Sequence, residues 1–244
     1  MVLLLKAVVV AFVAVMAGAT LFQRKLLYFP GHGPVMSELR EWLVDGQPAG
    51  FAREVKNPRN IWLMLHGNAG QAANRDYVLP CLAEEDSLYV MEYPGYGRRS
   101  GSPSKASIDR AALAAYENLR ASHPGVPLCV LGESIGSGPA CVLAGAPRPP
   151  DKVVLVVPFD RLADVAAGHL PWLPARWLLF DRWDNVAALR SYRGKVEIFG
   201  ARNDEVIPLR HARNLAASVP QAVFHEIPGG HNDWSNSSAV VIRN

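Results

Sequence analysis

Short apolar runs alternate with longer amphipathic stretches through most of the chain after residue 60. Each run is four to six residues long, which suits a buried strand, and each stretch between them can hold a helix. This alternation is typical of βαβ units, so we predict an α/β fold with a mostly parallel sheet and helices on both faces. The predicted strands are residues 61–65, 88–91, 128–131, 152–157, 196–199 and 222–227.

The intervening segments carry the predicted helices, at about 72–85, 107–122, 135–146 and 209–218. Residues 24–60 are rich in Pro and Gly and predict irregular structure. Within them we expect a short helix or turn at 39–44 and a strand at 51–56. Repeats and low-complexity tracts are absent from this sequence beyond its first segment, so a single folded unit is expected after that segment.

The first 25 residues are apolar enough to cross a membrane. Residues 2–22 contain a single charge, Lys6, and Arg24 and Lys25 follow directly. As a helix this stretch spans about 31 Å, close to the roughly 30 Å of a bilayer core. Lys6 can extend to the interface, and Arg24 and Lys25 resemble an interfacial stop. We therefore expect residues 1–25 to be a single-pass membrane anchor and the localisation to be a membrane.

Two other interpretations of this segment stay open. Lys6, the apolar core and the small residues Ala17-Gly18-Ala19 also fit a cleaved signal peptide, which would give a secreted or periplasmic protein. A buried core helix fits less well, because the apolar residues occur all round the helix rather than along one stripe. Charges at both ends leave the orientation of the anchor open.

Composition excludes several classes of protein. Half of the residues are hydrophobic and 19% are charged, which indicates a globular chain rather than a disordered one. The net charge of +3 is scattered, without a basic stripe, so nucleic acid is not an expected partner. Cys81, Cys129 and Cys141 make neither a disulfide framework nor a paired metal motif. We expect Cys129 and Cys141 to be buried and inert, and no metal or cofactor is expected.

One pentapeptide stands out, Gly132-Glu133-Ser134-Ile135-Gly136, between a predicted strand and a small-residue helix. A Gly-x-Ser-x-Gly turn in this context holds its serine on a strained strand-to-helix bend and exposes the hydroxyl. A neutral hydroxyl is a weak nucleophile, so a histidine must accept its proton and a carboxylate must orient that histidine. Ser134 is therefore the candidate nucleophile.

His231 is the candidate base among the seven histidines. It follows the last predicted strand, and the order serine, acid, histidine along the chain is a known arrangement of these three groups. Asp204, in the loop after the strand at 196–199, is the candidate acid. Asp160, just past the strand at 152–157, and Glu205 are the rivals.

When a serine attacks a carbonyl group, negative charge develops on the carbonyl oxygen, and two backbone N–H donors are needed to stabilise this oxyanion. One is expected from Ile135, directly after the nucleophile, at the start of the helix. The other is expected from the Gly-rich loop His66-Gly67-Asn68-Ala69-Gly70, with Asn68 the first choice and Ala69 the second. This loop lacks the Gly-Lys-Ser/Thr of a phosphate-binding loop.

Taken with Tyr93-Pro94-Gly95-Tyr96-Gly97 and Gly230-His231-Asn232-Asp233, these motifs give the chain a family resemblance. It resembles the α/β-hydrolases, in particular the single-pass, membrane-anchored serine hydrolases related to the prolyl-aminopeptidase-like proteins. That group includes protein depalmitoylases and lysophospholipid hydrolases. The resemblance implies Ser134 as nucleophile, Asp204 as acid and His231 as base, and it favours a retained anchor over a signal peptide.

Three features depart from the family pattern. Asp204 lies one residue farther from Gly200 than the usual spacing. The chain continues for thirteen residues after His231, where relatives often form a last helix, so we expect a frayed C-terminus. No cysteine cluster near Met1 supports a lipid anchor.

The 37 residues of 158–194 exceed what a plain crossover needs and, by resemblance, predict a lid over the site. The apolar content of this segment suits an acyl chain, and Trp172 and Trp177 are the candidate substrate-binding residues. Alternatively, these aromatic residues form the core of a two-helix excursion. Residues 26–244 are thus expected to form the catalytic domain, with the lid at about 158–194.

The expected function is hydrolysis of carboxylic ester or thioester bonds in an acyl-bearing, hydrophobic or lipid-like substrate, through an acyl-enzyme. An aminopeptidase ranks lower, because acidic residues to bind a free amine are not evident. A non-catalytic, membrane-anchored binding protein of the same fold is the third alternative.

Overall fold

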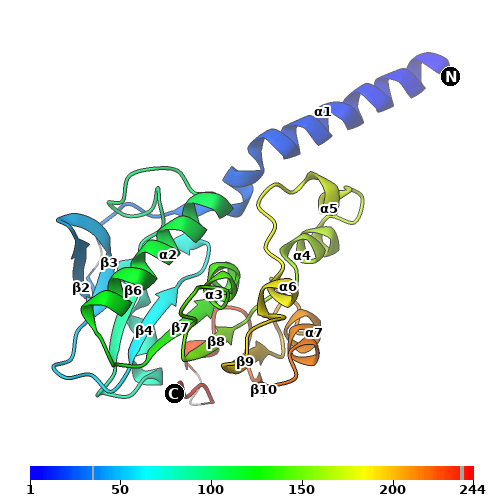
Figure 1. Cartoon of the computed structure of the whole chain (residues 1–244). Coiled ribbons are helices and arrows are strands. Elements are labelled where there is room, and N and C mark those ends of the chain that lie inside the picture. The colour runs from blue at the N-terminus through cyan, green and yellow to red at the C-terminus, as the bar shows by residue number, and fades with distance from the viewer. Residues whose placement is uncertain (35, 237–238) are drawn as a thin grey trace.

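An eight-stranded sheet forms the centre of the protein, in the order β10-β9-β8-β7-β4-β6-β3-β2 (Figure 1). The computed structural model describes residues 1–34, 36–236 and 239–244, without the side chains of Val8 and Val9. The strands of this sheet are β2 (Arg40–Val44), β3 (Gln47–Arg53), β4 (Ile61–Leu65), β6 (Ser87–Met91), β7 (Leu128–Glu133), β8 (Lys152–Val156), β9 (Lys195–Ala201) and β10 (Ala222–Ile227).

The six strands from β10 to β6 are parallel, which confirms the predicted mostly parallel sheet. The other edge is an antiparallel hairpin of β2 and β3, attached to β6. The prediction of a short helix or turn at 39–44 is therefore wrong, and the strand predicted at 51–56 lies earlier. The reason is the turn Asp45-Gly46, whose positive φ angles of 51° and 73° suit the right-handed twist of a two-residue hairpin.

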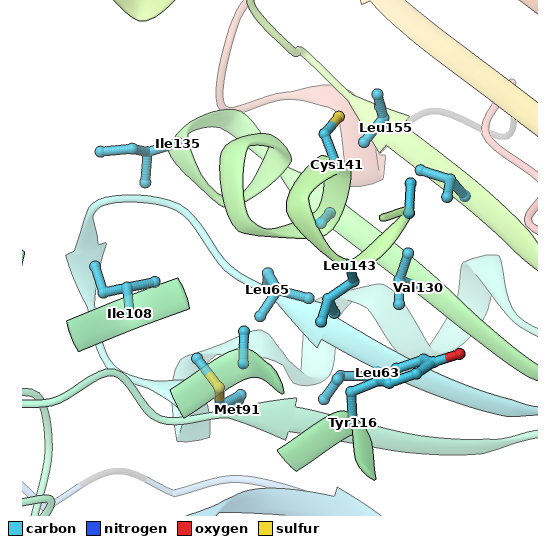
Figure 2. Close-up of a cluster of buried hydrophobic side chains, with 14 of the residues drawn as sticks. Leu63, Leu65, Met91, Ile108, Tyr116, Val130, Ile135, Cys141, Leu143 and Leu155 are labelled. Atoms are coloured by element: carbon cyan, nitrogen blue, oxygen red, sulfur yellow. The ribbon is translucent and has the colours of Figure 1, made fainter. Parts of the chain in front are cut away.

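Alternate residues of the buried strands face opposite sides of the sheet, although the strands are apolar throughout. On one face, Leu63 and Leu65 of β4 pack with Val130 and Leu155 against two helices, as Figure 2 shows. These helices are α2 (Lys105–Ser122) and α3 (Ser137–Leu143). This face is also covered by α6 (Asn185–Leu189) and α7 (Arg210–Ser218).

The opposite face is covered by η1 (Ala72–Cys81), together with the C-terminal residues. η1 is a 3₁₀ helix, not the longer helix predicted for 72–85. Gln71 and Asn74 close a tight i, i+3 turn at its start, and Pro80 lacks the N–H that an α-helix would need there. Val240 and Ile242 are buried in this layer, and the Ile242 N–H donates to the carbonyl of Cys81, so the expected fraying is not seen at these residues.

The helix α1 (Val2–Leu27) projects away from the sheet (Figure 1). It is long and apolar enough to span a membrane, and it is largely exposed. The short strand β1 (Phe29–Pro30) follows it and pairs with β5 (Ala69–Gly70). The end of α1 is thereby attached to the Gly-rich loop after β4.

The segment between β8 and β9 holds three short helices. They are α4 (Leu162–His169), α5 (Ala175–Leu178) and α6. Trp183, between α5 and α6, is buried against Gly138 of α3, where a Cβ would lie 2.5 Å from the indole. The segment is thus packed on the body through Trp183, while α4 and α5 lie beside the end of α1 (Figure 1).

Candidate active site

Ser134 occupies a strained turn between β7 and α3. Its φ of +54° lies in the left-handed region, which a serine adopts only where the surrounding structure enforces it. The turn, η2 (Ser134–Gly136), depends on the two flanking glycines. A Cβ on Gly136 would lie 2.0 Å from the carbonyl oxygen of Leu65, and one on Gly132 would lie 2.7 Å from Ala140. The backbone is therefore close enough to hold the hydroxyl at the carboxyl end of the sheet.

A continuous hydrogen-bond chain joins the three residues predicted as a triad. The Ser134 hydroxyl donates to Nε2 of His231 at 2.9 Å, and His231 Nδ1–H donates to Oδ2 of Asp204 at 2.8 Å. The other oxygen of Asp204 accepts the N–H groups of Val206 and Ile207, at 2.9 and 2.7 Å. These two bonds fix the carboxylate, so the unusual spacing from Gly200 does not prevent it from reaching His231.

The rival carboxylates have other surroundings. Asp160 is buried and accepts Nδ1–H of His211 at 2.7 Å, the N–H of Arg161 at 2.6 Å and the amide of Asn214 at 3.1 Å. Although burial would raise its pKa, these hydrogen bonds, led by that from His211, hold the pKa of Asp160 below its ordinary value. Glu205 is exposed. In the described part of the chain, neither residue forms a hydrogen bond with His231.

The loop after β4 lies against the serine turn, because β4 and β7 are neighbours and Leu65 pairs with Gly132. In the part of the chain that the structure describes, the N–H groups of Asn68 and Ile135 donate to no protein acceptor. The Asn68 side chain donates to the Leu27 carbonyl at 2.9 Å, and its own carbonyl accepts the N–H of Phe29 at 2.9 Å. Ala69 belongs to β5. The backbone N–H groups of Asn68, in this loop, and of Ile135, directly after the serine, are thus free in the described structure.

Glu133, the variable residue of the pentapeptide, has a role that the sequence did not suggest. Its buried carboxylate accepts the Gly67 N–H at 3.1 Å, the Tyr77 hydroxyl at 2.6 Å and the Trp234 indole N–H at 3.0 Å. Burial favours the neutral acid, but the nearby Arg75 guanidinium and these bonds hold the pKa of Glu133 below its ordinary value. One charged group therefore joins the loop of Asn68 to the segment just after His231.

The cysteines take no part in this site. All three are buried and free, as predicted for Cys129 and Cys141. Burial raises the pKa of each thiol, that of Cys129 to about 12, so none of them is a thiolate at neutral pH.

The two tryptophans predicted to bind substrate lie in the segment between β8 and β9. Trp172 and Trp177 are 58% and 82% exposed. A different residue of this segment, His169 at the end of α4, donates its Nε2–H at 2.7 Å to the carbonyl of Val206, in the loop that carries Asp204. A surface hollow of about 400 Å³ lies beside His231 and gives solvent a route to it.

The protein thus has an α/β fold in which a serine, a histidine and a carboxylate are joined by hydrogen bonds at the carboxyl end of the parallel strands. The sequence profile of the alpha/beta hydrolase fold family matches residues 62–191. The chain belongs to this family.

Two relatives show how far the likeness extends. The uncharacterized protein Rv2307c of Mycobacterium tuberculosis is 34% identical over 92% of this chain and 88% of its own length. The lysophosphatidylserine lipase ABHD12 of Danio rerio is 27% identical over 69% of this chain, but over only 52% of its own length.

Among solved structures, the Pyrococcus furiosus esterase Pf2001 superposes with a TM-score of 0.64 at 13% identity, covering 87% of this chain and 96% of the esterase. A thioesterase domain from the curacin biosynthetic pathway gives a TM-score of 0.60 at 15% identity, over 84% of this chain and 97% of that domain. At these identities the likeness shows the fold alone. Together the comparisons support a hydrolase of ester bonds; they do not identify the depalmitoylase or prolyl-aminopeptidase subgroup.

Proposed function

We propose that the protein is a serine hydrolase that cleaves carboxylic ester or thioester bonds of an acyl-bearing, hydrophobic substrate. The observation that carries this proposal is the unbroken hydrogen-bond chain from the Ser134 hydroxyl through His231 to Asp204. In this chain the Asp204 carboxylate fixes the proton of His231 on Nδ1, which leaves Nε2 free to accept the proton of Ser134.

The reaction proceeds in two halves. The Ser134 oxygen attacks the substrate carbonyl carbon while His231 takes the hydroxyl proton, and the N–H groups of Asn68 and Ile135 stabilise the oxyanion that forms. Collapse of this intermediate breaks the bond to the alcohol or thiol, which leaves with the proton from His231. Water, deprotonated by His231, then attacks the acyl-enzyme, and the acid and the free Ser134 hydroxyl are regenerated.

The names of the relatives agree with ester chemistry. The lipase, the esterase and the thioesterase domain each act, by name, on acyl esters or thioesters. We further propose that α1 is retained as a membrane anchor, since Arg24 and Lys25 close the apolar helix at the side of the body. A membrane-anchored hydrolase would meet acyl-bearing substrates at the bilayer.

The test compares the full-length wild type with Ser134→Ala in detergent micelles. A fluorophosphonate probe should label the wild type and leave Ser134→Ala unlabelled, with both proteins giving the same circular dichroism spectrum. A panel of acyl esters and thioesters, with proline-β-naphthylamide beside them, then separates an esterase from an aminopeptidase. A folded wild type that does not label, and turns over none of these compounds, would show a non-catalytic binding protein instead.

A further inference from the structure

An apolar pocket of about 160 Å³ lies between the last turns of α1 and the lid. On the helix side it is lined by Ala19, Leu26 and Leu27, and on the lid side by Ala166, Leu173 and Leu178, among other residues. Its surface is almost entirely carbon. Such a pocket suits a hydrocarbon chain and offers no partner for a charged or strongly polar group.

We propose that this pocket binds the acyl chain of a membrane lipid or lipid-modified substrate, so that the anchor helix itself forms one wall of the substrate site. This inference rests on the proposed hydrolase function and specifies its substrate class. The anchor then does more than hold the enzyme at the bilayer, because the pocket would not exist without the last turns of α1.

The pocket wall is joined directly to the candidate active site. Leu27, in the wall, accepts the side-chain amide of Asn68 through its carbonyl oxygen at 2.9 Å. On the opposite side, His169 of α4 donates a hydrogen bond to the carbonyl of Val206. The N–H of Val206 in turn donates to the Asp204 carboxylate. The two walls are therefore in contact with the oxyanion loop and with the loop of the acid, respectively.

Polar contacts hold the helix and the lid together around the apolar pocket. The Gln23 side chain donates to the Leu178 carbonyl at 3.1 Å and accepts the Phe180 N–H at 2.6 Å. Arg24 and the Tyr28 hydroxyl both donate to the buried Asp181 carboxylate, at 3.0 and 3.1 Å. These contacts make the wall a fixed surface rather than a chance approach of two segments.

The position of the pocket indicates a membrane acyl chain as its occupant. Trp172, Trp177 and Phe180 are exposed in the lid, and its helix α5 lies beside α1 (Figure 1). Exposed tryptophans beside an apolar span are typical of the membrane interface. A cavity of about 150 Å³ holds one benzene molecule, so about six chain carbons fit inside. A longer chain would continue outward along α1.

The proposal is tested by filling the pocket in the full-length protein. Ala166→Phe places a ring in the lid wall, and Ala19→Phe does so from the helix. We measure kcat/KM for p-nitrophenyl octanoate and p-nitrophenyl acetate in micelles. Each buried methylene of the acyl chain raises kcat/KM about fourfold. A ring that keeps three methylenes of the octanoyl chain out of the pocket should therefore lower the octanoate-to-acetate ratio of kcat/KM about 50-fold. Ala167→Phe, on the same helix but outside the pocket lining, is the matched control and should keep the wild-type ratio.

A binding experiment separates this proposal from the proposed function. Ser134→Ala protein in nanodiscs is irradiated with palmitic acid that carries a diazirine in mid-chain, and crosslinks are expected in 19–27 and 166–179, competed by palmitate. Crosslinks confined to other segments, or an unchanged ester ratio in both filled variants, would overturn the pocket. Specific crosslinks in a wild type that no fluorophosphonate labels would support the pocket and overturn the hydrolase.

Discussion

The protein contains two pairs of histidine and aspartate with nearly the same local geometry. His231 donates Nδ1–H to Asp204 at 2.8 Å, and His211 donates Nδ1–H to Asp160 at 2.7 Å. They differ at the other ring nitrogen. His231 Nε2 accepts the Ser134 hydroxyl, whereas His211 Nε2 is buried and has no hydrogen-bond partner in the described part of the chain.

The difference shows that a carboxylate–histidine pair does not by itself define a catalytic site. The carboxylate fixes the tautomer in both pairs, but a base also needs a nucleophile at its free nitrogen and access for the substrate. The His231 side chain is 11% exposed and borders a surface hollow, and that of His211 is 4% exposed. Asp160 instead joins the loop after β8 to His211 and Asn214 of α7 through hydrogen bonds.

The largest expected contrast comes from replacing each histidine by Asn. The Asn amide can keep the hydrogen bond to the aspartate, but it removes Nε2. His231→Asn should therefore lower kcat for a short acyl ester by about 10⁵-fold, because the base is lost. His211→Asn should change kcat less than about threefold. Equal losses in the two variants, measured by initial rates on folded protein, would contradict the assignment of His231.

The aspartates give the next contrast. Asp204→Asn should reduce kcat about 10⁴-fold, since an amide in place of the carboxylate favours the wrong tautomer of His231. Asp160→Asn should leave kcat within about threefold of the wild type. If Asp160→Asn alone abolished activity, Asp160 would be the acid, and the hydrogen bond between Asp204 and His231 would not be needed for catalysis.

A smaller effect is expected from Glu133, which joins the two loops of the site. Glu133→Gln cannot accept all three hydrogen bonds, so the oxyanion loop loses its fixed position and kcat should fall about 10- to 100-fold with little change in KM. Asp86→Asn is the matched control. This buried carboxylate holds Asn60 and Trp62 at the opposite end of the sheet, both at 2.8 Å. It should lower stability without lowering kcat.

The smallest effect concerns stability against acid. The lowered pKa of Asp160 means that the ionised carboxylate stabilises the fold above the ordinary Asp pKa, and that this contribution is lost as the pH falls through the lowered value. Asp160→Asn should cost about 2 kcal/mol in the free energy of unfolding at pH 7. The deficit should shrink below about pH 4. Urea unfolding of both proteins at several pH values measures it; a constant deficit would exclude the linkage.

The sequence predicted the parallel half of the fold well, because its strands carry their signal locally. The bounds of β4 and β10 coincide with the predicted 61–65 and 222–227. The hairpin of β2 and β3 was missed although Asp45-Gly46 is a strong turn signal, because the strands beside it are neither strictly alternating nor uniformly apolar.

For the candidate site, the sequence could predict only which residues follow the ends of strands and in what order. Ser134, Asp204 and His231 follow three strands that end at one edge, so their proximity could be expected, and their catalytic roles stay predictions. The partners of Glu133 could not be expected. Its contact with Trp234 joins residues 101 positions apart, and the second residue of a Gly-x-Ser-x-Gly motif carries no sign of its surroundings.

The attachment of α1 to the body has a consequence for proteolytic release. The polar contacts with the lid and the bond to Asn68 begin at Gln23, four residues beyond the Ala17-Gly18-Ala19 segment. A protease cutting after Ala19 would free the protein from the bilayer and leave those contacts in place, and of the helix side of the pocket it would remove Ala19 alone. Cutting beyond Tyr28 would remove them together with the whole helix side of the pocket. In the proposed arrangement, the residues of α1 that span the bilayer lie mainly before this cut, and most of those that line the pocket lie after it.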